Sequence, residues 1–424
     1  MRDETIAIHG GYEPGSTRAV AVPIYQTVAH EFTDADQAGA IMDLEQPGFH
    51  YNRINNPTVD VLERRLAALE EGTAAVAVSS GAAAVSMSVL NVAGCGDNVV
   101  SVPQLYGATY TYFAHVLPRL GIEVRFARAD DAGSLAALID ERTRALFCET
   151  VGNPAGNVID LEAVARVAHD RGVPVIADNT VATPFLLKPL RHGADVVIHS
   201  LTKFIGGHGT TLGGIVIDGG RFPWLEHAER FSWFADPEPA FHGVRYGSEF
   251  EHAPYATRLR TVGLRNSGSS LSPFNAFLHL QGLETLAIRL PRHESNARIV
   301  ADFLAEDPRV ESVSFLGRPD SPYRALVERY LGGRAPSILT FRVRGGRDAG
   351  IAVFNAVRLF KRLLNMGDAR SLITHPASTT HRQLRPQELE AAGITQDMLR
   401  LSIGLEHPDD LLEDLDRALA AAVR

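Results

Sequence analysis

The sequence predicts an α/β protein built on a mostly parallel sheet, followed by a smaller α/β domain. Two observations favour this class. From residue 57 onward, short apolar runs alternate with segments of helical periodicity, which is typical of βαβ units. Most of these runs are apolar at successive positions, as expected for strands buried on both faces. With 424 residues the chain is also too long for one ordinary domain.

The first 56 residues differ from the rest of the chain. They are rich in Gly, Pro, Asn and Gln, and their hydrophobic periodicity is weak. We expect residues 1–56 to form an extended arm without a core of its own. Such an arm must lie on another surface, and we expect it to contact a neighbouring subunit.

Residues 57–270 are expected to form the large domain. An amphipathic helix over 58–72 ends at a glycine, and a strand over 74–80 is followed directly by a helix over 81–93. Further strands are predicted at 97–103, 124–129, 144–149, 173–179 and 194–200. Ligands of such sheets gather at the carboxyl ends of the strands, so functional residues are expected there.

Residues 271–424 are expected to form the smaller α/β domain. A long helical stretch begins at 273, and a final helix covers 408–423. Strands are predicted between them at 310–315, 337–343 and 398–405.

Composition argues against several classes of protein. The formal net charge of −9 disfavours a nucleic-acid surface. No run of about 18 apolar residues predicts a membrane span, and the charged start lacks a signal-type apolar stretch. The two cysteines are not in metal-ligand spacing and no HExxH motif occurs, so no metal site is expected. A cytoplasmic enzyme fits this composition.

The strongest candidate site combines Asp178 with the segment Ser200, Thr202 and Lys203. Each group ends an apolar strand, and the interval of one βαβ step places both at one crevice. In pyridoxal chemistry a lysine forms an imine with the cofactor aldehyde, while an aspartate keeps the pyridine nitrogen protonated. The two serine-type hydroxyls can donate to the cofactor phosphate. Taken singly, Lys203 could instead be an exposed loop lysine and Asp178 a helix cap.

A second candidate is SSGAAA, residues 79–84, at the predicted strand-to-helix turn. A serine can cap the helix, and the amides of Gly81 and Ala82 can point at an anion. From this motif alone, a plain capped helix start is the favoured interpretation. No GxGxxG or Walker lysine loop is present to support nucleotide binding.

Arg400 and Tyr106 are further candidates, each with an ordinary structural alternative. Alternation places Arg400 on the opposite strand face from Leu399 and Leu401, where it either faces solvent or meets a carboxylate. Tyr106 either stacks on a planar cofactor or fills the core.

The motifs ADNT, SLTKF, YNRINNPT, LYGATY and ETVGNP together resemble the Cys/Met-metabolism family of pyridoxal-phosphate enzymes nearly end to end. The resemblance implies an aspartate-aminotransferase-like fold (fold type I) and pyridoxal 5'-phosphate as cofactor. The segments GDARSLITHPASTTH and FHGVRYGSEF look like the O-acetylhomoserine sulfhydrylase branch.

The resemblance also implies roles for individual residues. Lys203, as the Schiff-base lysine, and Tyr106, stacked on the ring, would be catalytic, and Asp178 would meet the ring nitrogen. The cofactor phosphate would be held by Gly81, Ala82, Ser200 and Thr202, together with Tyr51 and Arg53 of a neighbouring subunit. The substrate would be oriented by Asn153, Ser371 and Arg400, with Arg400 on its α-carboxylate.

The reaction implied is γ-replacement on O-acetyl-L-homoserine with sulfide or a small thiol, in a homotetramer made of two active dimers. Two departures from the branch bear on the substrate: His30 replaces a usual tyrosine, and Ala108 replaces a usual glycine. The alternatives are a γ-lyase that releases a 2-oxo acid and ammonia from a substituted homoserine, and a non-catalytic protein that binds the cofactor.

Overall fold

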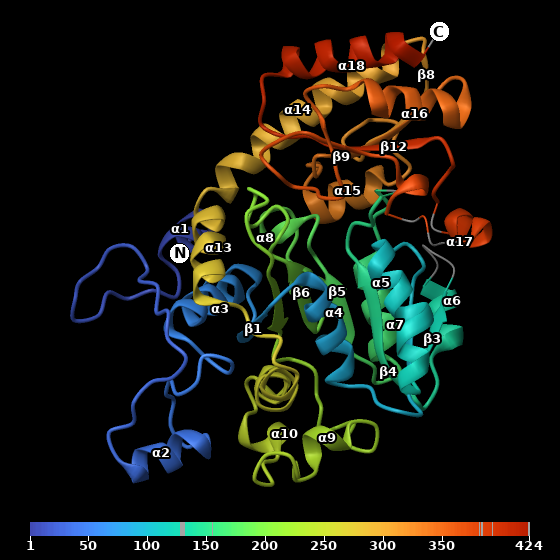
Figure 1. The fold of residues 1–424 in the computed structure, drawn as a ribbon. Helices are drawn as coiled ribbons and strands as arrows, with labels where there is room; N and C mark the ends of the chain where they lie inside the picture. Colours follow the sequence, from blue (N-terminus) through green and yellow to red (C-terminus); the bar gives the residue numbers. More distant parts are fainter. Residues whose placement is uncertain (128–131, 155, 381, 383–384, 392, 423–424) are drawn as a thin grey trace.

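The computed structural model describes residues 1–127, 132–154, 156–380, 382, 385–391 and 393–422. Figure 1 shows two α/β units, each built around its own sheet. The larger sheet has the strand order β1-β7-β6-β5-β4-β2-β3. Its strands are β1 (Ala74–Val78), β2 (Asn98–Ser101), β3 (Glu123–Phe126), β4 (Thr143–Glu149), β5 (Val175–Asp178), β6 (Val196–Ser200) and β7 (Gly214–Asp218).

Parallel pairing dominates this sheet, as the sequence predicted. Only β7 runs antiparallel to its neighbours β1 and β6. The register places Glu149 beside Asp178, and Asp178 beside Ile198. The strand ends that carry Glu149, Asp178 and Ser200 therefore meet at one edge of the sheet. Residues 128–129, at the end of one predicted strand, lie outside the described residues.

Helices cover both faces of the large sheet and connect its strands (Figure 1). They are α3 (Pro57–Glu70), α4 (Gly81–Leu90), α5 (Gly107–Thr111), α6 (Ala132–Leu138), α7 (Leu161–His169) and α8 (Thr183–Leu186). Short π and 3₁₀ segments extend this layer: η1 (Tyr112–Val116), η2 (Leu117–Leu120) and η3 (Pro189–His192). The boundaries of α3 follow from its sequence, since Asn56 caps the first amides, Pro57 occupies the first turn and Glu71 ends the helix in a left-handed conformation.

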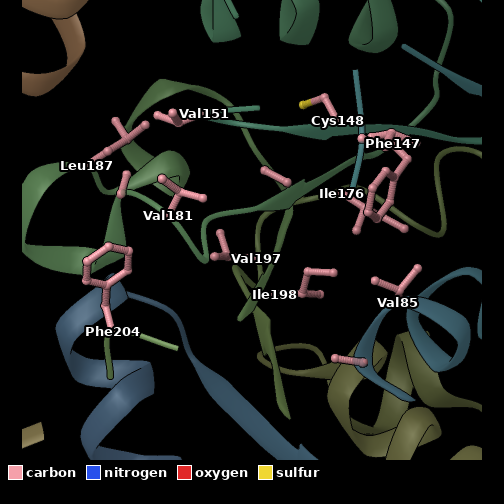
Figure 2. Close-up of a cluster of buried hydrophobic side chains, with 14 of the residues drawn as sticks. Val85, Phe147, Cys148, Val151, Ile176, Val181, Leu187, Val197, Ile198 and Phe204 are labelled. Carbon is pink, nitrogen blue, oxygen red and sulfur yellow. The ribbon is translucent and has the colours of Figure 1, made fainter. Parts of the chain in front are cut away.

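The core that supports the strand ends is apolar and closely packed. Figure 2 shows side chains from β4, β5 and β6, among them Phe147, Ile176 and Val197, gathered with Val85 of α4 and Phe204. Phe147 and Phe204 are fully buried. Burying a side chain of this size contributes roughly 1.5–3 kcal/mol, so this core fixes the strand ends firmly.

The smaller sheet has the strand order β10-β11-β12-β9-β8 and is mainly antiparallel. Its strands are β8 (Val310–Ser314), β9 (Ile338–Val343), β10 (Lys361–Arg362), β11 (Leu372–Thr374) and β12 (Met398–Ser402). The elements around it are α14 (Leu286–Glu306), α15 (Arg324–Leu331), α16 (Gly346–Ala356), η5 (Pro376–Ser378), α17 (Pro386–Ala391) and α18 (Pro408–Ala422).

The connection between the sheets begins with irregular structure and ends in a helix that packs on the large unit. Its elements are α9 (Ser232–Ala235), α10 (Tyr246–Glu249), α11 (Pro254–Arg258), η4 (Leu259–Leu264), α12 (Arg265–Ser267) and α13 (Pro273–Glu284). Helix α13 packs on α3, whereas α14 packs on β8 and α18. The domain limits at 56 and 270 stay predictions.

The first 56 residues lie along the large unit with little regular structure. Helix α1 (Asp3–His9) packs on α3, and α2 (Ala35–Met42) projects away from both sheets (Figure 1). Thr58 fastens the arm, because its hydroxyl donates to the Pro23 carbonyl and accepts from the Tyr25 amide. Among the described residues, no helix combines the length and apolar character needed to cross a membrane.

Candidate active site

A cavity of about 430 Å³ lies at the carboxyl edge of the large sheet. Its wall is formed by the start of α4, by the loop at Tyr106 and by the ends of β4, β5 and β6. The smaller unit closes it with Leu364, Met366 and Arg400. The cavity therefore lies between the two units, where the strand-end prediction placed the functional residues.

Lys203 faces this cavity. It follows β6 in a turn, where its main-chain amide donates to the Ser200 carbonyl at 3.2 Å. Its Nζ donates to Oδ1 of Asn365 at 2.7 Å. Burial, with a smaller contribution from the charge of Arg400, lowers the pKa of Lys203 to about 8. An exposed loop lysine would show neither the cavity position nor this shift.

Asp178 and Glu149 form a pair of carboxyl groups at the cavity floor, since their residues are paired across β4 and β5. Oδ1 of Asp178 accepts from the Thr180 amide at 2.9 Å. Burial raises the pKa of Asp178, and burial together with the Asp178 charge raises the pKa of Glu149 well above its ordinary value. The buried Glu149 and the half-buried Asp178 place two carboxyl groups side by side, which favours a ligand that brings a positive charge, such as a protonated ring nitrogen.

The turn between β1 and α4 lies beside Ser200. The Ser80 hydroxyl accepts from the Ala83 amide, so the predicted helix cap is present. The first-turn amides of Gly81 and Ala82 precede any intrahelical acceptor and line the cavity. A Cβ at Gly81 would lie 2.5 Å from Cβ of Ser200. Only glycine allows this close approach, which forms a cradle for an anion.

Thr202 lies slightly apart from this cradle. Its hydroxyl accepts from the Gly213 amide at 3.1 Å and lies 3.3 Å from the Gly213 carbonyl. It lines a second, more open cavity of about 660 Å³ that shares Lys203 with the first. The structure thus brings Gly81, Ala82 and Ser200 together in the main cavity, whereas Thr202 lines the second cavity with Lys203.

Tyr106 lines the main cavity and is 39% exposed, so it does not fill the core. Its main-chain amide donates to Oε1 of Glu149 at 2.5 Å. The buried glutamate therefore holds the loop that presents the tyrosine ring. Ala108, one of the two departures noted in the sequence, lies in the same wall.

Arg400 is buried, with 2% of its surface exposed, which excludes the solvent-facing alternative. Its Nη1 donates to Oδ1 of Asn153 at 2.8 Å, and its Nη2 donates to the Asn365 carbonyl at 2.9 Å and to Oγ1 of Thr374 at 3.1 Å. Among the described residues, no partner meets its Nε. Arg400 and Asn153 both line the cavity, where a guanidinium can bind a carboxylate.

Three predicted residues lie elsewhere. Ser371 is buried outside the cavity wall, where its hydroxyl donates to Glu406 at 2.8 Å and accepts from the Gly404 amide at 2.8 Å. Tyr51 and Arg53 belong to the arm; the Arg53 guanidinium lies over the Tyr51 ring and donates to the Arg265 carbonyl. Neither lines the cavity of its own chain, so their role toward a neighbouring subunit stays a prediction.

Comparison with known proteins identifies this arrangement. The sequence matches the Cys/Met metabolism PLP-dependent enzymes over residues 4–420. The chain belongs to this family. The predicted family and its cofactor, pyridoxal phosphate, are therefore confirmed.

Members of the family resemble the chain along its whole length. A homocysteine synthase of Schizosaccharomyces pombe is 45% identical over 99% of this chain and 98% of its own. O-acetyl-L-homoserine sulfhydrylase 1 of Thermus thermophilus is also 45% identical, over 99% of this chain and all of its own.

A solved structure extends the likeness to three dimensions. The putative O-acetylhomoserine (thiol)-lyase of Campylobacter jejuni has a TM-score of 0.97, is 41% identical, and covers 99% of this chain and all of its own. That structure contains N'-pyridoxyl-lysine-5'-monophosphate, in which the cofactor is linked to a lysine. The predicted aspartate-aminotransferase-like fold is thus confirmed.

Sequence reasoning missed two members of the site. Glu149 could have been found, because it is the last residue of an apolar strand beside that of Asp178. Asn365 had no such signal, since it lies in an irregular segment 162 positions from Lys203.

Proposed function

We propose that the chain catalyses γ-replacement on O-acetyl-L-homoserine with sulfide or a small thiol; with sulfide the products are L-homocysteine and acetate. The observation that carries this proposal is the common cavity of Lys203 and Arg400, a base and a carboxylate-binding group. The names of the relatives that match the full length of the chain support the same reaction.

The residues of the cavity fit pyridoxal phosphate. Lys203 would hold its aldehyde carbon, Asp178 its ring nitrogen, and the cradle of Gly81, Ala82 and Ser200 its phosphate. Tyr106 would lie against its ring. When bound, the cofactor withdraws electrons from the α-carbon of the amino acid and makes the α-proton removable.

Lys203 would move the protons of the reaction. A pKa of about 8 leaves a substantial fraction of the amine neutral near neutral pH, so Nζ can accept the α-proton. Once Nζ has passed the α-proton on to the electron-withdrawing cofactor, the neutral amine would accept a β-proton, which allows acetate to leave the γ-carbon with the electrons of the C–O bond. The sulfur of hydrosulfide forms the new bond to the γ-carbon, and the protons return to the α- and β-carbons.

Arg400 would bind the substrate α-carboxylate and so aim the α-carbon at Lys203. Lys203 and Arg400 are the cationic side chains among the described residues that line the cavity. In this proposal Lys203 binds the cofactor and Arg400 binds the α-carboxylate. The remaining wall includes the apolar side chains of Val85, Val181 and Leu364. A succinyl carboxylate on the leaving group would find no further cationic partner among the described residues of the wall, which favours acetyl.

We further propose that the active enzyme is a cytoplasmic homo-oligomer, a dimer of active dimers. The position of Tyr51 and Arg53 outside their own cavity supports a site completed by a second copy. Sedimentation of the purified protein tests this assembly, and a monomer with full activity would contradict it.

Incubation of the purified enzyme with O-acetyl-, O-succinyl- and unsubstituted homoserine, with and without sulfide, tests the function. We expect homocysteine from the acetyl ester only when sulfide is present. Formation of 2-oxobutanoate and ammonia in equal amounts without sulfide would instead identify a γ-lyase. Absence of both product formation and spectral change would identify a non-catalytic binding protein.

A further inference from the structure

Lys203, the proposed base, and Arg400, the proposed carboxylate-binding residue, are both hydrogen-bonded to Asn365. The Oδ1 atom of Asn365 accepts from Nζ of Lys203 at 2.7 Å, and its main-chain carbonyl accepts from Nη2 of Arg400 at 2.9 Å. Asn365 belongs to the smaller unit, in the segment between β10 and β11. It therefore connects the lysine of the large sheet to the arginine of the small one.

The segment that carries Asn365 is fastened to both units. The Gly367 amide donates to Oγ of Ser402 in β12 at 2.9 Å, and the Ala369 amide donates to the Gly207 carbonyl at 2.9 Å. A Cβ at Gly367 would lie 2.6 Å from the main-chain nitrogen of Phe204, the residue after Lys203. These contacts fix Asn365 relative to the lysine turn.

The side-chain oxygen of Asn365 is a suitable partner for an amine that acts as a base. An amide oxygen accepts hydrogen bonds, whereas a lysine amine donates them. A neutral amine can give one N–H to Oδ1 and keep its lone pair for an incoming proton. Because the charged amine donates to the same oxygen, the contact holds Nζ in place before and after it takes a proton.

We propose that Asn365 is a positioning residue for the proton transfers: its side-chain oxygen holds the free Lys203 amine, and its main-chain oxygen holds Arg400. Base and carboxylate-binding group are thereby kept in a fixed relation. The kinetic part of this inference rests on the proposed function, whereas the contact itself does not.

Side-chain substitutions isolate the contact, since they leave the main-chain bond to Arg400 in place. Asn365→Asp keeps the shape and adds a negative charge beside the ammonium group, so the pKa of Lys203 should rise by about one unit or more. Asn365→Ala removes an acceptor that stabilises the ammonium form, so this pKa should fall. The other titratable groups that line the main cavity with the amine are unchanged in all variants: Tyr106, Tyr112, Glu149, Asp178 and Arg400.

Amine reactivity measures this pKa without any catalysis. The chain has three lysines, Lys188, Lys203 and Lys361, so each can be followed by mass spectrometry as its own peptide. Cofactor-free protein is labelled with a trace of an amine-reactive reagent between pH 6 and pH 11. We expect the midpoint of Lys203 to shift in opposite directions in the aspartate and alanine variants, while the other two lysines stay unchanged. An unchanged Lys203 midpoint in both variants would overturn the inference.

Steady-state kinetics of the loaded enzyme test the positioning. A hydrogen bond to a charged group is typically the equivalent of a tenfold effect or more. We therefore expect Asn365→Ala to lower kcat about tenfold or more, with KM for the amino acid changed less than about twofold. A matched control is Asn275→Ala, because Asn275 lines the second cavity, yet among the described residues its side chain bonds only the Leu212 carbonyl.

The two assays separate the possible failures. If the control keeps wild-type kcat while Asn365→Ala loses it, the inference stands. Wild-type kcat in Asn365→Ala would overturn it. If no substrate reacts with the wild-type enzyme, the proposed function fails, whereas the labelling result still decides the contact. Equal cofactor content and equal circular dichroism across the variants are required before kinetics are compared.

Discussion

Substitution of Asp178 by asparagine should change the cofactor-free and the cofactor-loaded protein in opposite directions. One oxygen of the carboxyl is taken by the Thr180 amide, and the paired residue on β4 is Glu149, a buried carboxyl. In the absence of cofactor, burial outweighs the Thr180 hydrogen bonds and the charge of His199 at this carboxyl. Burial therefore raises the pKa of Asp178 from its ordinary value of 3.8.

The sign of the effect on stability follows from that direction. The pKa of Asp178 is higher in the folded protein than its ordinary value of 3.8 in the unfolded chain, so protonation of Asp178 stabilises the fold. This stabilisation is complete below pH 3.8 and is lost as the pH rises through the pKa of the folded protein. The asparagine side chain of the variant cannot ionise and avoids this loss. The cofactor-free variant should thus match or exceed the wild type in melting temperature at pH 7, and its advantage should shrink toward pH 4.

In the loaded protein the ionised carboxylate would meet the protonated ring nitrogen. A hydrogen bond to a charged group contributes about 1.5–3 kcal/mol, so Asp178→Asn should weaken cofactor binding roughly 10- to 100-fold. Equilibrium dialysis measures the affinity and differential scanning fluorimetry the two melting temperatures. Asp302→Asn, an exposed position, serves as control. Unchanged affinity in the Asp178 variant, or a cofactor-free form less stable than wild type at pH 7, would refute the reasoning.

Further predictions concern the substrate, the base and the cradle. Arg400→Lys loses the guanidinium fork, so KM for the amino acid should rise about tenfold or more while cofactor affinity holds; an unchanged KM would place the carboxylate elsewhere. Since the pKa of Lys203 is lowered to about 8, kcat should rise between pH 7 and pH 9 as the free amine loses its proton; a flat profile would contradict this. Gly81→Ala pushes a methyl group against Ser200 and should weaken cofactor binding tenfold or more, whereas Gly39→Ala, whose new Cβ meets nothing within 4 Å, should not; equal affinities would show that the cradle is not used.

The sequence predicted the large sheet and its reactive edge because both depend on local patterns. Apolar runs mark the parallel strands, and parallel strands place their last residues together. That rule alone brought Asp178 and Lys203 to one cavity. Strand β7 was missed: it is an antiparallel strand within the large sheet, after the glycine-rich loop. Its Gly-bounded run, Ile215–Ile217, was a local strand signal, whereas its antiparallel pairing with β1 joins distant segments and leaves none.

The remainder of the site depends on contacts between distant segments. Arg400 lies in a central strand of the small sheet, so alternation along β12 could not distinguish a solvent face from the face that meets the large unit. Ser371 was expected to orient the substrate; its hydroxyl donates to Glu406 of a separate loop, and its role toward the substrate stays a prediction. The proposed contacts of Tyr51 and Arg53 with a second chain are likewise beyond a single sequence.

The central claim is that the amine of Lys203 holds the cofactor in this cavity, and borohydride reduction tests it directly. Reduction fixes a lysine-linked cofactor permanently, and mass spectrometry of the digested protein then finds the modified peptide among the three lysines. We predict pyridoxyl modification at Lys203 alone, and at least a ~10²–10⁴-fold loss of turnover in Lys203→Ala. Modification at Lys188 or Lys361, or normal turnover in Lys203→Ala, would contradict the account.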